Sequence, residues 1–241
     1  MSDKNIWKIT PEQINILSNC QKVNEIILIK ESTNTLVSVD ALDDSFTMIY
    51  INEDFNYGID KEIVVHNLSE ILKSIKNIEN PSITFSDDRI SVTDIDGNIK
   101  CNFLYATNDL VDGIRGIYDS YDKLIDGIKE DEDKYEFKIT ENEFNLIKKF
   151  TSFGHNSLSF VNGKIIIYDN TASNDVNIKD NIEIKIPESD SINKDFRIDL
   201  DIALFKKMQT GKYDCTLSSQ GFALFQETDG MNIYGIVSNI L

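Results

Sequence analysis

The sequence predicts an α+β protein in which one unit, a strand followed by a helix and three further strands, occurs four times. A strand–cap–helix phrase recurs at residues 7–23, 63–78, 135–150 and 196–208. After each phrase come short runs rich in Ile, Val and Thr, bounded by Asn, Asp, Ser or Gly, as in antiparallel strands joined by turns. A phrase that recurs at this spacing indicates internal duplication. Two units in each half predict two tandem domains with antiparallel sheets on one side and one layer of helices on the other.

In the first half, both helices have recognisable starts. Thr10 is expected to cap a helix that begins at Pro11, where the missing proline N–H costs nothing. Asn67 is expected to cap a second helix over residues 68–78. Asp96-Gly97 predicts a two-residue hairpin turn. We expect strands at residues 7–10, 25–30, 35–42, 46–52, 62–66, 82–86, 89–95 and 98–107.

The second half repeats the pattern. Thr140 is expected to cap a helix over residues 141–151, and the fourth helix covers residues 201–208. Asn162-Gly163 is a second hairpin signal. We expect strands at residues 135–139, 157–161, 164–169, 176–186, 195–198, 212–218, 222–227 and 231–237.

Residues 108–134 separate the two halves. Apolar residues recur there at helical spacing, but Gly113, Gly116 and Gly127 argue against an uninterrupted helix. The segment ends in an acidic run at residues 130–133, which is typical of a solvated linker. We therefore predict domains at residues 1–107 and 135–241, joined by a connector at residues 108–134.

Charge is distributed unevenly along the chain. The 241 residues carry a net charge of -17, which by itself argues against nucleic acid as a partner. The four predicted helices differ from this average, because they hold seven lysines against five carboxylates, and the carboxylates lie in the first turns. For a single helix, this arrangement only complements the helix dipole. Four such helices on one side would form a wall of lysines, which bind phosphates without reading bases. The seven lysines are Lys22, Lys73, Lys76, Lys148, Lys149, Lys206 and Lys207.

Residues that could carry catalysis or hold a metal do not form a recognisable site. His66 and His155 cannot be assembled with Ser or Cys into a triad. Asp94, Asp96 and Gly97 do not complete a calcium-loop pattern, and a hairpin turn explains them better. The acidic pairs Asp43-Asp44 and Asp87-Asp88 lie at strand ends, where turn acids are common. With no Gly-rich phosphate loop either, we expect a protein that is not an enzyme and needs no cofactor or metal.

Cysteine usage and hydropathy indicate the compartment. Cys20, Cys101 and Cys215 form no C-x-x-C pair, which fits a reducing cytosol. No apolar run approaches the roughly 18 residues of a membrane span, and the first residues, MSDKN, are polar rather than a secretory signal. We expect a cytoplasmic protein with no membrane partner.

Several stretches resemble one known family. LFKKMQTGKYDCTLSSQGFALFQ at residues 204–226 resembles the sliding clamps of T-even-type bacteriophages, ring-shaped DNA polymerase processivity factors with the PCNA-like fold. NEFNLIKKF, LSFVNGKIIIYDN, LSEILKSI and ITFSDDRISVTDIDGNIK resemble it too. The resemblance implies a homotrimeric ring with helices around the central hole and sheets that continue between subunits. It implies an ATP-dependent loader that opens the ring onto duplex DNA and, in phage relatives, a role in late transcription.

The resemblance also extends the set of expected site residues. It adds Lys212 to the DNA-facing lysines, and it implies a pocket for polymerase tails near the connector and the residues Val237, Ile240 and Leu241. We therefore expect a clamp that encircles DNA and tethers the replicative polymerase in the cytoplasm, that of a bacterial host if the gene is a phage's. Two alternatives stay open: a virion or protein-interaction module on the same fold without DNA, and a monomeric processivity factor.

Overall fold

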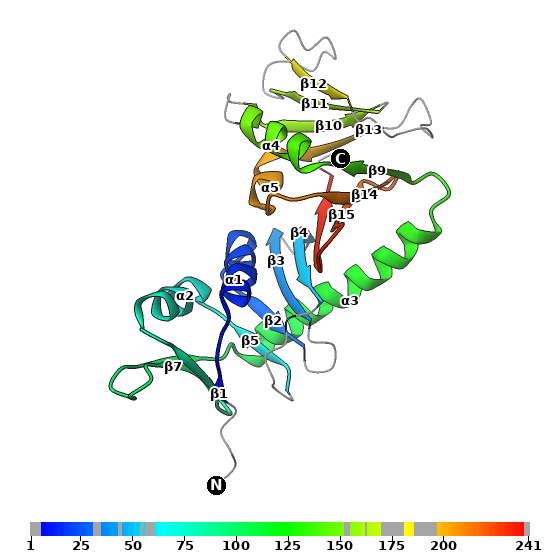
Figure 1. Ribbon diagram of the computed structural model, residues 1–241. Coiled ribbons are helices and arrows are strands. Elements are labelled where there is room, and N and C mark those ends of the chain that lie inside the picture. Colours follow the sequence, from blue (N-terminus) through cyan, green and yellow to red (C-terminus); the bar gives the residue numbers. More distant parts are fainter. Residues whose placement is uncertain are drawn as a thin grey trace. The chain divides into compact units, whose positions relative to one another are not determined.

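The computed structural model describes residues 6–30, 35–42, 45–53, 55, 61–151, 155–161, 163–169, 181–185 and 197–238. They belong to two compact units (Figure 1). Unit 1 comprises Met1–Asp40 and Tyr50–Ser120, and unit 2 comprises Ala41–Ile49 and Tyr121–Leu241. Helix α3 (Asn108–Glu130) contributes residues to both units.

Unit 1 contains two repeats of the predicted order. The first is β1 (Ile6–Trp7), α1 (Pro11–Val23), β2 (Ile27–Ile29), β3 (Leu36–Leu42) and β4 (Ser45–Asn52), of which the last residues belong to this unit. The second is β5 (Ile63–Val65), α2 (Leu68–Asn77), β6 (Ser82–Phe85), β7 (Arg89–Thr93) and β8 (Lys100–Leu104). The strands form one sheet in the order β1-β6-β7-β8 and another run in the order β5-β2-β3-β4. Helices α1 and α2 pack against each other.

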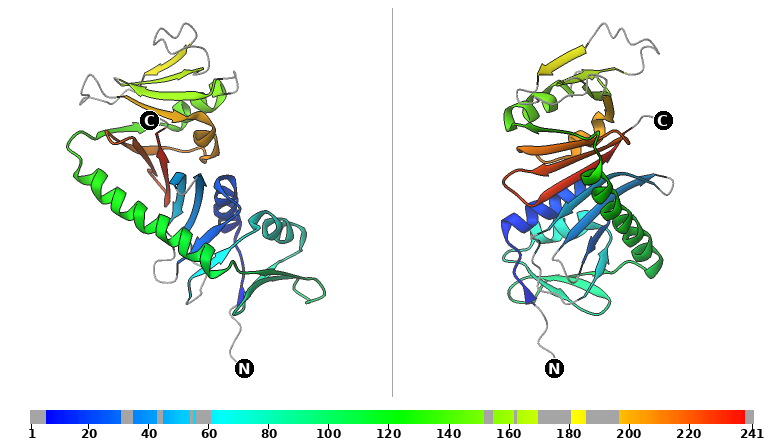
Figure 2. Two further views of the ribbon diagram at one scale, coloured as in Figure 1. Left: turned by 180° about the vertical axis from the view of Figure 1, so that it is seen from behind. Right: turned by 90° about the vertical axis from the view of Figure 1, so that its right-hand side faces the viewer.

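Unit 2 repeats this order twice more. Its third repeat is β9 (Tyr135–Ile139), α4 (Glu141–Phe150), β10 (Ser157–Val161), β11 (Lys164–Tyr168) and β12 (Asn181–Lys185). The fourth is β13 (Arg197–Asp201), α5 (Ile202–Lys207), β14 (Tyr213–Ser218), β15 (Phe222–Glu227) and β16 (Asn232–Val237). The strands are antiparallel, in the orders β12-β11-β10-β13 and β16-β15-β14-β9 (Figure 2). The predicted α+β fold with four strand–helix–three-strand units is therefore confirmed.

One hairpin was predicted correctly and the other is longer than expected. Val161 pairs with Lys164, so two residues lie between β10 and β11; Gly163 has φ +74°, and Asn162 lies outside the described residues. Between β7 and β8 the last paired residues are Thr93 and Lys100, which makes the predicted two-residue turn wrong. The Asp94 carboxylate accepts a hydrogen bond from the Ile99 amide at 2.8 Å and so stabilises a wider loop.

Helix α3 runs without a break from Asn108 to Glu130, although its three glycines argued against an uninterrupted helix. The buried residues Ile114, Tyr121 and Ile128 recur every seven residues along one stripe of α3. A Cβ at any of the three glycines would meet nothing within 4 Å, so they lie on the open side of the helix. Packing of the apolar stripe outweighs the low helix propensity of glycine.

The helix caps show where the local sequence is sufficient to predict the structure. Thr10 and Thr140 both cap their helices as expected, and the structure adds that each does so in a capping box, with Gln13 and Glu143 as the partners. Asn67 lies at the N-cap position of α2 as expected, but it has φ +60° and its side chain makes no cap hydrogen bond.

Glu25 supplies the cap of α2 instead. Its carboxylate accepts a hydrogen bond of 2.7 Å from the Ser69 amide, and its carbonyl accepts one of 3.1 Å from Leu68. Burial alone would raise the pKa of Glu25, but the hydrogen bonds from Ser69 and Gln21 outweigh it and hold the pKa of this carboxyl below its ordinary value.

The strand before α5 ends later than predicted. β13 continues to Asp201, whose carboxylate accepts a hydrogen bond of 2.7 Å from the Ala203 amide and caps a helix of six residues. Of the strand predicted at residues 176–186, the described part is β12; residues 176–180 and 186 lie outside the described residues.

Candidate nucleic-acid interface

In unit 1 the predicted DNA-facing lysines lie on the two neighbouring helices. Lys22 is near the end of α1, and Lys73 and Lys76 are on α2; all three side chains are exposed. The opposite side of α2 is apolar and buried, with Ile71 and Ile75 facing the core. This amphipathic arrangement puts the lysines at the surface because the apolar stripe must be covered.

In unit 2 the corresponding lysines also belong to one helix pair. Figures 1 and 2 show α4 and α5 side by side, and the rings of Phe144 and Phe205 pack between them with centroids 4.7 Å apart. Lys149 and Lys206 are exposed, whereas Lys148 and Lys207 are half-buried; Lys212, also exposed, lies between α5 and β14. Within each unit, the structure thus brings together lysines that are far apart in the sequence.

These lysines differ in whether their ammonium groups already form hydrogen bonds or ion pairs with other groups of the protein. Lys22 donates to Asn19 at 3.0 Å, and Lys73 pairs with Glu70 at 2.8 Å. The hydrogen bond to Glu70 raises the pKa of Lys73. Lys212 lies 3.7 Å from Asp229, and Lys148 donates to the Met208 carbonyl. In the described part of the chain, no ion pair or hydrogen bond occupies the ammonium of Lys76 or Lys206.

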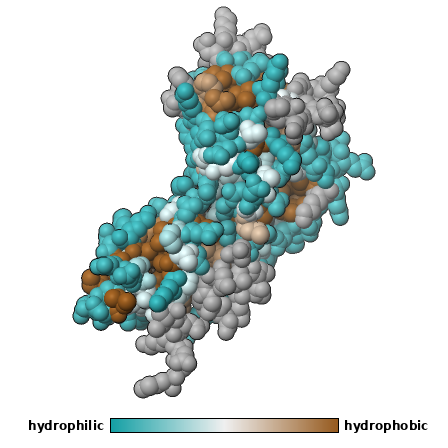
Figure 3. All heavy atoms as spheres, viewed as in Figure 1, coloured by the Kyte–Doolittle hydropathy of each residue, from teal (hydrophilic) through white to brown (hydrophobic). Residues whose placement is uncertain are grey.

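A second surface feature was not predicted from the sequence. Large apolar side chains are exposed on or beside β8, which among the described residues is the last strand of its sheet: Ile95, Ile99 and Leu104 are 72%, 51% and 57% exposed. We call these three residues and β8 the β8 edge; apolar residues are visible at this end of the unit in Figure 3. The available signal was the position of Ile95 and Ile99 on both sides of Asp96-Gly97, where hairpin tips are usually polar.

Unit 2 also has a sheet whose last strand, among the described residues, has one edge without a pairing partner. β12 pairs only with β11 there, and exposed Asn181, Glu183 and Lys185 alternate with half-buried isoleucines. An unpaired strand edge presents a row of backbone donors and acceptors to another chain.

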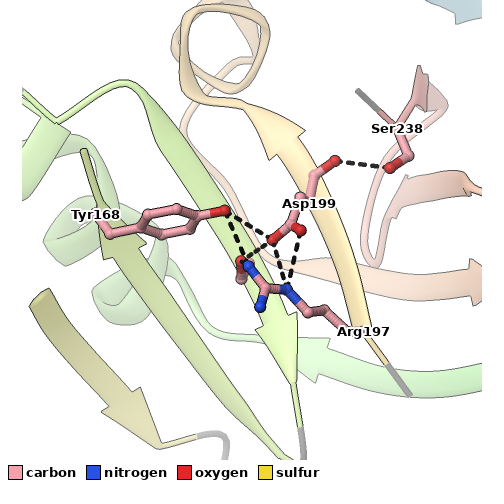
Figure 4. Close-up of polar contacts among 5 residues, drawn as sticks. Tyr168, Arg197, Asp199 and Ser238 are labelled. Atoms are coloured by element: carbon pink, nitrogen blue, oxygen red, sulfur yellow. Dashed lines mark hydrogen bonds and ion pairs between the residues drawn. The ribbon is translucent and has the colours of Figure 1, made fainter. Parts of the chain in front are cut away.

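A polar cluster on the sheet β12-β11-β10-β13 holds the only Arg side chain of unit 2 (Figure 4). The Arg197 guanidinium donates to the Asp199 carboxylate at 2.9 Å and to the Tyr168 hydroxyl at 3.1 Å. Ser159 also donates to Asp199, and Ser238 donates to the Asp199 carbonyl at 2.8 Å. Arg197 is therefore neutralised within the unit. The i, i+2 spacing of Arg197 and Asp199 on one strand could have indicated this pair.

The predicted partner-binding residues are placed only in part. Val237 is half-buried at the end of β16 and pairs with Phe222. Ile240 and Leu241 lie outside the described residues.

The described residues contain no group of three or more His, Cys, Asp or Glu side chains that could hold a metal ion. Asp88 pairs with Arg89 at 2.6 Å, which lowers the pKa of Asp88, and Asp43-Asp44 lies outside the described residues. Cys20 and Cys215 are buried, and burial raises the pKa of both thiols. None of the described helices is both long enough and apolar enough to cross a membrane.

Comparison with solved structures identifies the fold. The Helicobacter pylori beta clamp in complex with 5-chloroisatin matches with TM-score 0.67 and 12% identity over 100% of this chain and 68% of that chain. The Helicobacter pylori beta clamp bound to a DNA ligase peptide gives 0.64 and 12%, over 100% and 67%. A putative DNA polymerase III beta subunit from Eubacterium rectale gives 0.62 and 16%, over 100% and 67%.

The chain therefore has the fold of the sliding clamps, and more particularly the fold of bacterial DNA polymerase III beta clamps. No family model and no curated protein sequence matches the chain.

Proposed function

We propose that this chain is a sliding DNA clamp, a non-enzymatic protein that encircles duplex DNA and tethers the replicative DNA polymerase. The observation that carries the proposal is the combination of the sliding-clamp fold with exposed lysines on the helix pair of each unit, in a chain whose net charge is -17. Acidic surface elsewhere would repel DNA, so contact would be confined to the helices.

Lysine suits a clamp that must slide. Its ammonium is a hydrated point charge on a flexible stem, so it contacts phosphates without fixing register or reading bases. The grip on DNA would be loose and salt-dependent, and persistence on DNA would come from ring closure. A polymerase held on the ring would gain processivity through its raised effective concentration near the primer end.

Ring closure requires that copies of the chain join head to tail. Strands β8 and β12 are each five residues long, and among the described residues each pairs with a neighbouring strand on one side only. The β8 edge of one copy could join β12 of the next, and it exposes apolar side chains that a partner would cover. Heterologous contacts of this kind close into a ring when the rotation per subunit allows it. The resemblance to T-even-type phage clamps supports three copies.

The remaining partners follow from the clamp proposal. Because the sequence has no Gly-rich phosphate loop, ring opening would need a separate ATP-dependent loader. The Helicobacter pylori beta clamp is bound to a DNA ligase peptide, and we propose that peptides of the polymerase dock near Val237, Ile240 and Leu241. A phage origin would place the protein in the host bacterial cytoplasm and add late-transcription factors as partners.

Native mass spectrometry at micromolar concentration tests the ring. We expect a species of 82.5 kDa, three times the 27.5 kDa of one chain. Leu104→Glu should convert it to monomers, because a carboxylate would be buried at the β8 edge. A wild-type monomer would contradict the ring and favour the non-ring processivity factor.

A processivity assay with the loader and polymerase tests the DNA-facing residues. Lys76→Glu combined with Lys206→Glu should abolish the increase in product length while the trimer mass is retained. Lys123→Glu, the same charge change on the exposed side of α3, is the matched control and should have no effect. A trimer that neither binds DNA nor responds to these changes would favour the virion or interaction module.

A further inference from the structure

Helix α5 depends on its surroundings for its position. It has only six residues, fewer than an isolated helix needs to be stable. Its first turn is capped by Asp201, and its apolar residues Ile202, Leu204 and Phe205 are buried. After its last residue, the Met208 amide donates to the Phe205 carbonyl at 3.2 Å. The carbonyl of Met208 itself then accepts a hydrogen bond from outside the helix.

The donor of that bond is Lys148 of α4. Its ammonium also lies 5.1 Å from the centroid of the Phe144 ring, in cation–π geometry. Phe144 in turn packs on Phe205 of α5. One aromatic pair and one lysine thus join the same two helices, and a cation at the C-terminal end of a helix is also favoured by the helix dipole.

Lys206 is in the opposite situation. It lies on the exposed side of α5, and within the described residues no carboxylate or carbonyl engages its ammonium. It can therefore approach a phosphate without first breaking an internal contact, whereas Lys148 would have to give up both the Met208 carbonyl and the Phe144 ring.

We propose that Lys148 is a positioning residue that fixes the end of α5 against α4, and that Lys206 is a phosphate-contacting cation of this helix pair. The second half of this inference rests on the proposed clamp function, and the first half does not. In the resulting division of roles, Lys148 of α4 supports the end of α5, and Lys206 of α5 presents its charge to DNA.

The first experiment uses no DNA. Lys148→Met and Lys206→Met remove the same charge and keep a similar stem, so they form a matched pair. We expect Lys148→Met to lower Tm by about 2–4 °C, as loss of one partly buried hydrogen bond should in a chain of this size. Lys206→Met should leave Tm unchanged, and Lys148→Arg should restore it. In wild type, an amine-reactive reagent should modify Lys206 faster than Lys148. Equal reactivity, together with an unchanged Tm for Lys148→Met, would overturn the positioning role.

The second experiment measures the affinity of the full chain for a fluorescent 30-base-pair duplex as a function of salt. Lys206→Met should reduce the slope of log K against log salt by about 0.9 for each phosphate that the protein no longer neutralises. Lys148→Met should weaken binding without changing that slope, and Lys148→Arg should restore the affinity. A slope reduced as much by Lys148→Met as by Lys206→Met would refute the division of roles. Absence of any duplex binding by wild type would contradict the proposed function and the role of Lys206, while the experiment without DNA would still decide the role of Lys148.

Discussion

Units 1 and 2 share one order of elements but fill their cores with different side chains. In unit 2, rings from both repeats form a connected cluster with centroid separations between 4.7 and 6.5 Å. Its members are Tyr135, Phe137, Phe144, Phe160, Phe205, Tyr213, Phe225 and Tyr234. In unit 1, the same layer between helices and strands is mostly aliphatic, with Leu17, Ile27, Leu68, Ile71, Ile83 and Ile90.

This difference shows that the position of apolar residues, more than their identity, specifies the repeat. Cores tolerate extensive substitution when pattern and total volume are kept. A small pocket of about 20 Å³, partly open to solvent, lies in unit 1 among apolar side chains that include Trp7, Phe55 and Val65. Because its lining is apolar and lacks convergent polar groups, we interpret it as imperfect packing rather than as a ligand site.

The largest expected change in stability comes from a substitution in the aromatic cluster. Phe225 is fully buried and contacts the rings of Phe160, Phe205 and Tyr213. We expect Phe225→Ala to lower the free energy of unfolding by about 3–5 kcal/mol, measured by urea denaturation. Ile90→Val in unit 1, which removes one buried methylene, should cost about 0.5–1.5 kcal/mol. Similar costs for both variants would mean that the cluster is no more important than the aliphatic core.

The next effect compares a distant cap with a local one. Glu25→Ala removes the cap of α2, and Thr140→Ala removes that of α4; each should cost about 1 kcal/mol at pH 7. Because the folded-state pKa of Glu25 lies below its ordinary value, its contribution is complete above the unfolded pKa of about 4.3. That contribution is lost as the pH falls through the folded-state pKa.

Urea denaturation of wild type and Glu25→Ala between pH 7 and pH 3 measures this dependence. The difference between the two proteins should shrink at the acidic end. A difference that stays constant with pH would show that Glu25 acts through packing and not through its charge.

A smaller effect concerns α3, which contributes to both units. Gly116→Ala and Gly127→Ala should each raise the free energy of unfolding by about 0.4–1 kcal/mol, because both sites are helical with open space around them. The two gains should add, since the sites are three turns apart on the helix. Thermal unfolding of the single and double variants measures this. A loss at one site only would indicate that this side of α3 is covered in the assembled protein.

The smallest effect tests the packing of unit 1. Val65→Ile adds one methylene at the wall of the pocket and should raise the free energy of unfolding by up to about 0.8 kcal/mol, measured in urea. Destabilisation would show that the pocket is too narrow at Val65 to accept it.

Prediction from the sequence succeeded where the causes were local. The capping boxes of Thr10 and Thr140 involve residues three positions apart, and the alternation of Tyr135, Phe137 and Ile139 appears as buried positions of β9. It failed where a distant group intervened. Nothing near Asn67 shows that Glu25, 44 residues before Ser69, occupies the start of α2. Likewise, the three glycines of α3 argued against a helix that its buried stripe stabilises.

The amino-acid sequence alone determined the fourfold repeat, the amphipathic helices and the concentration of lysine on them, because these depend on periodicity and composition over a few turns. Only the tertiary structure decided which lysines are available. Lys148 of α4 and Lys206 of α5 belong to the same helix pair, yet Lys148 reaches a carbonyl 60 residues further along, whereas within the described residues no hydrogen bond or ion pair engages the ammonium of Lys206. The same holds for the β8 edge, whose apolar residues are exposed because no described segment packs over them. Whether a side chain is available for contact depends on which groups the fold places beside it, and the residues adjacent in sequence do not predict these groups.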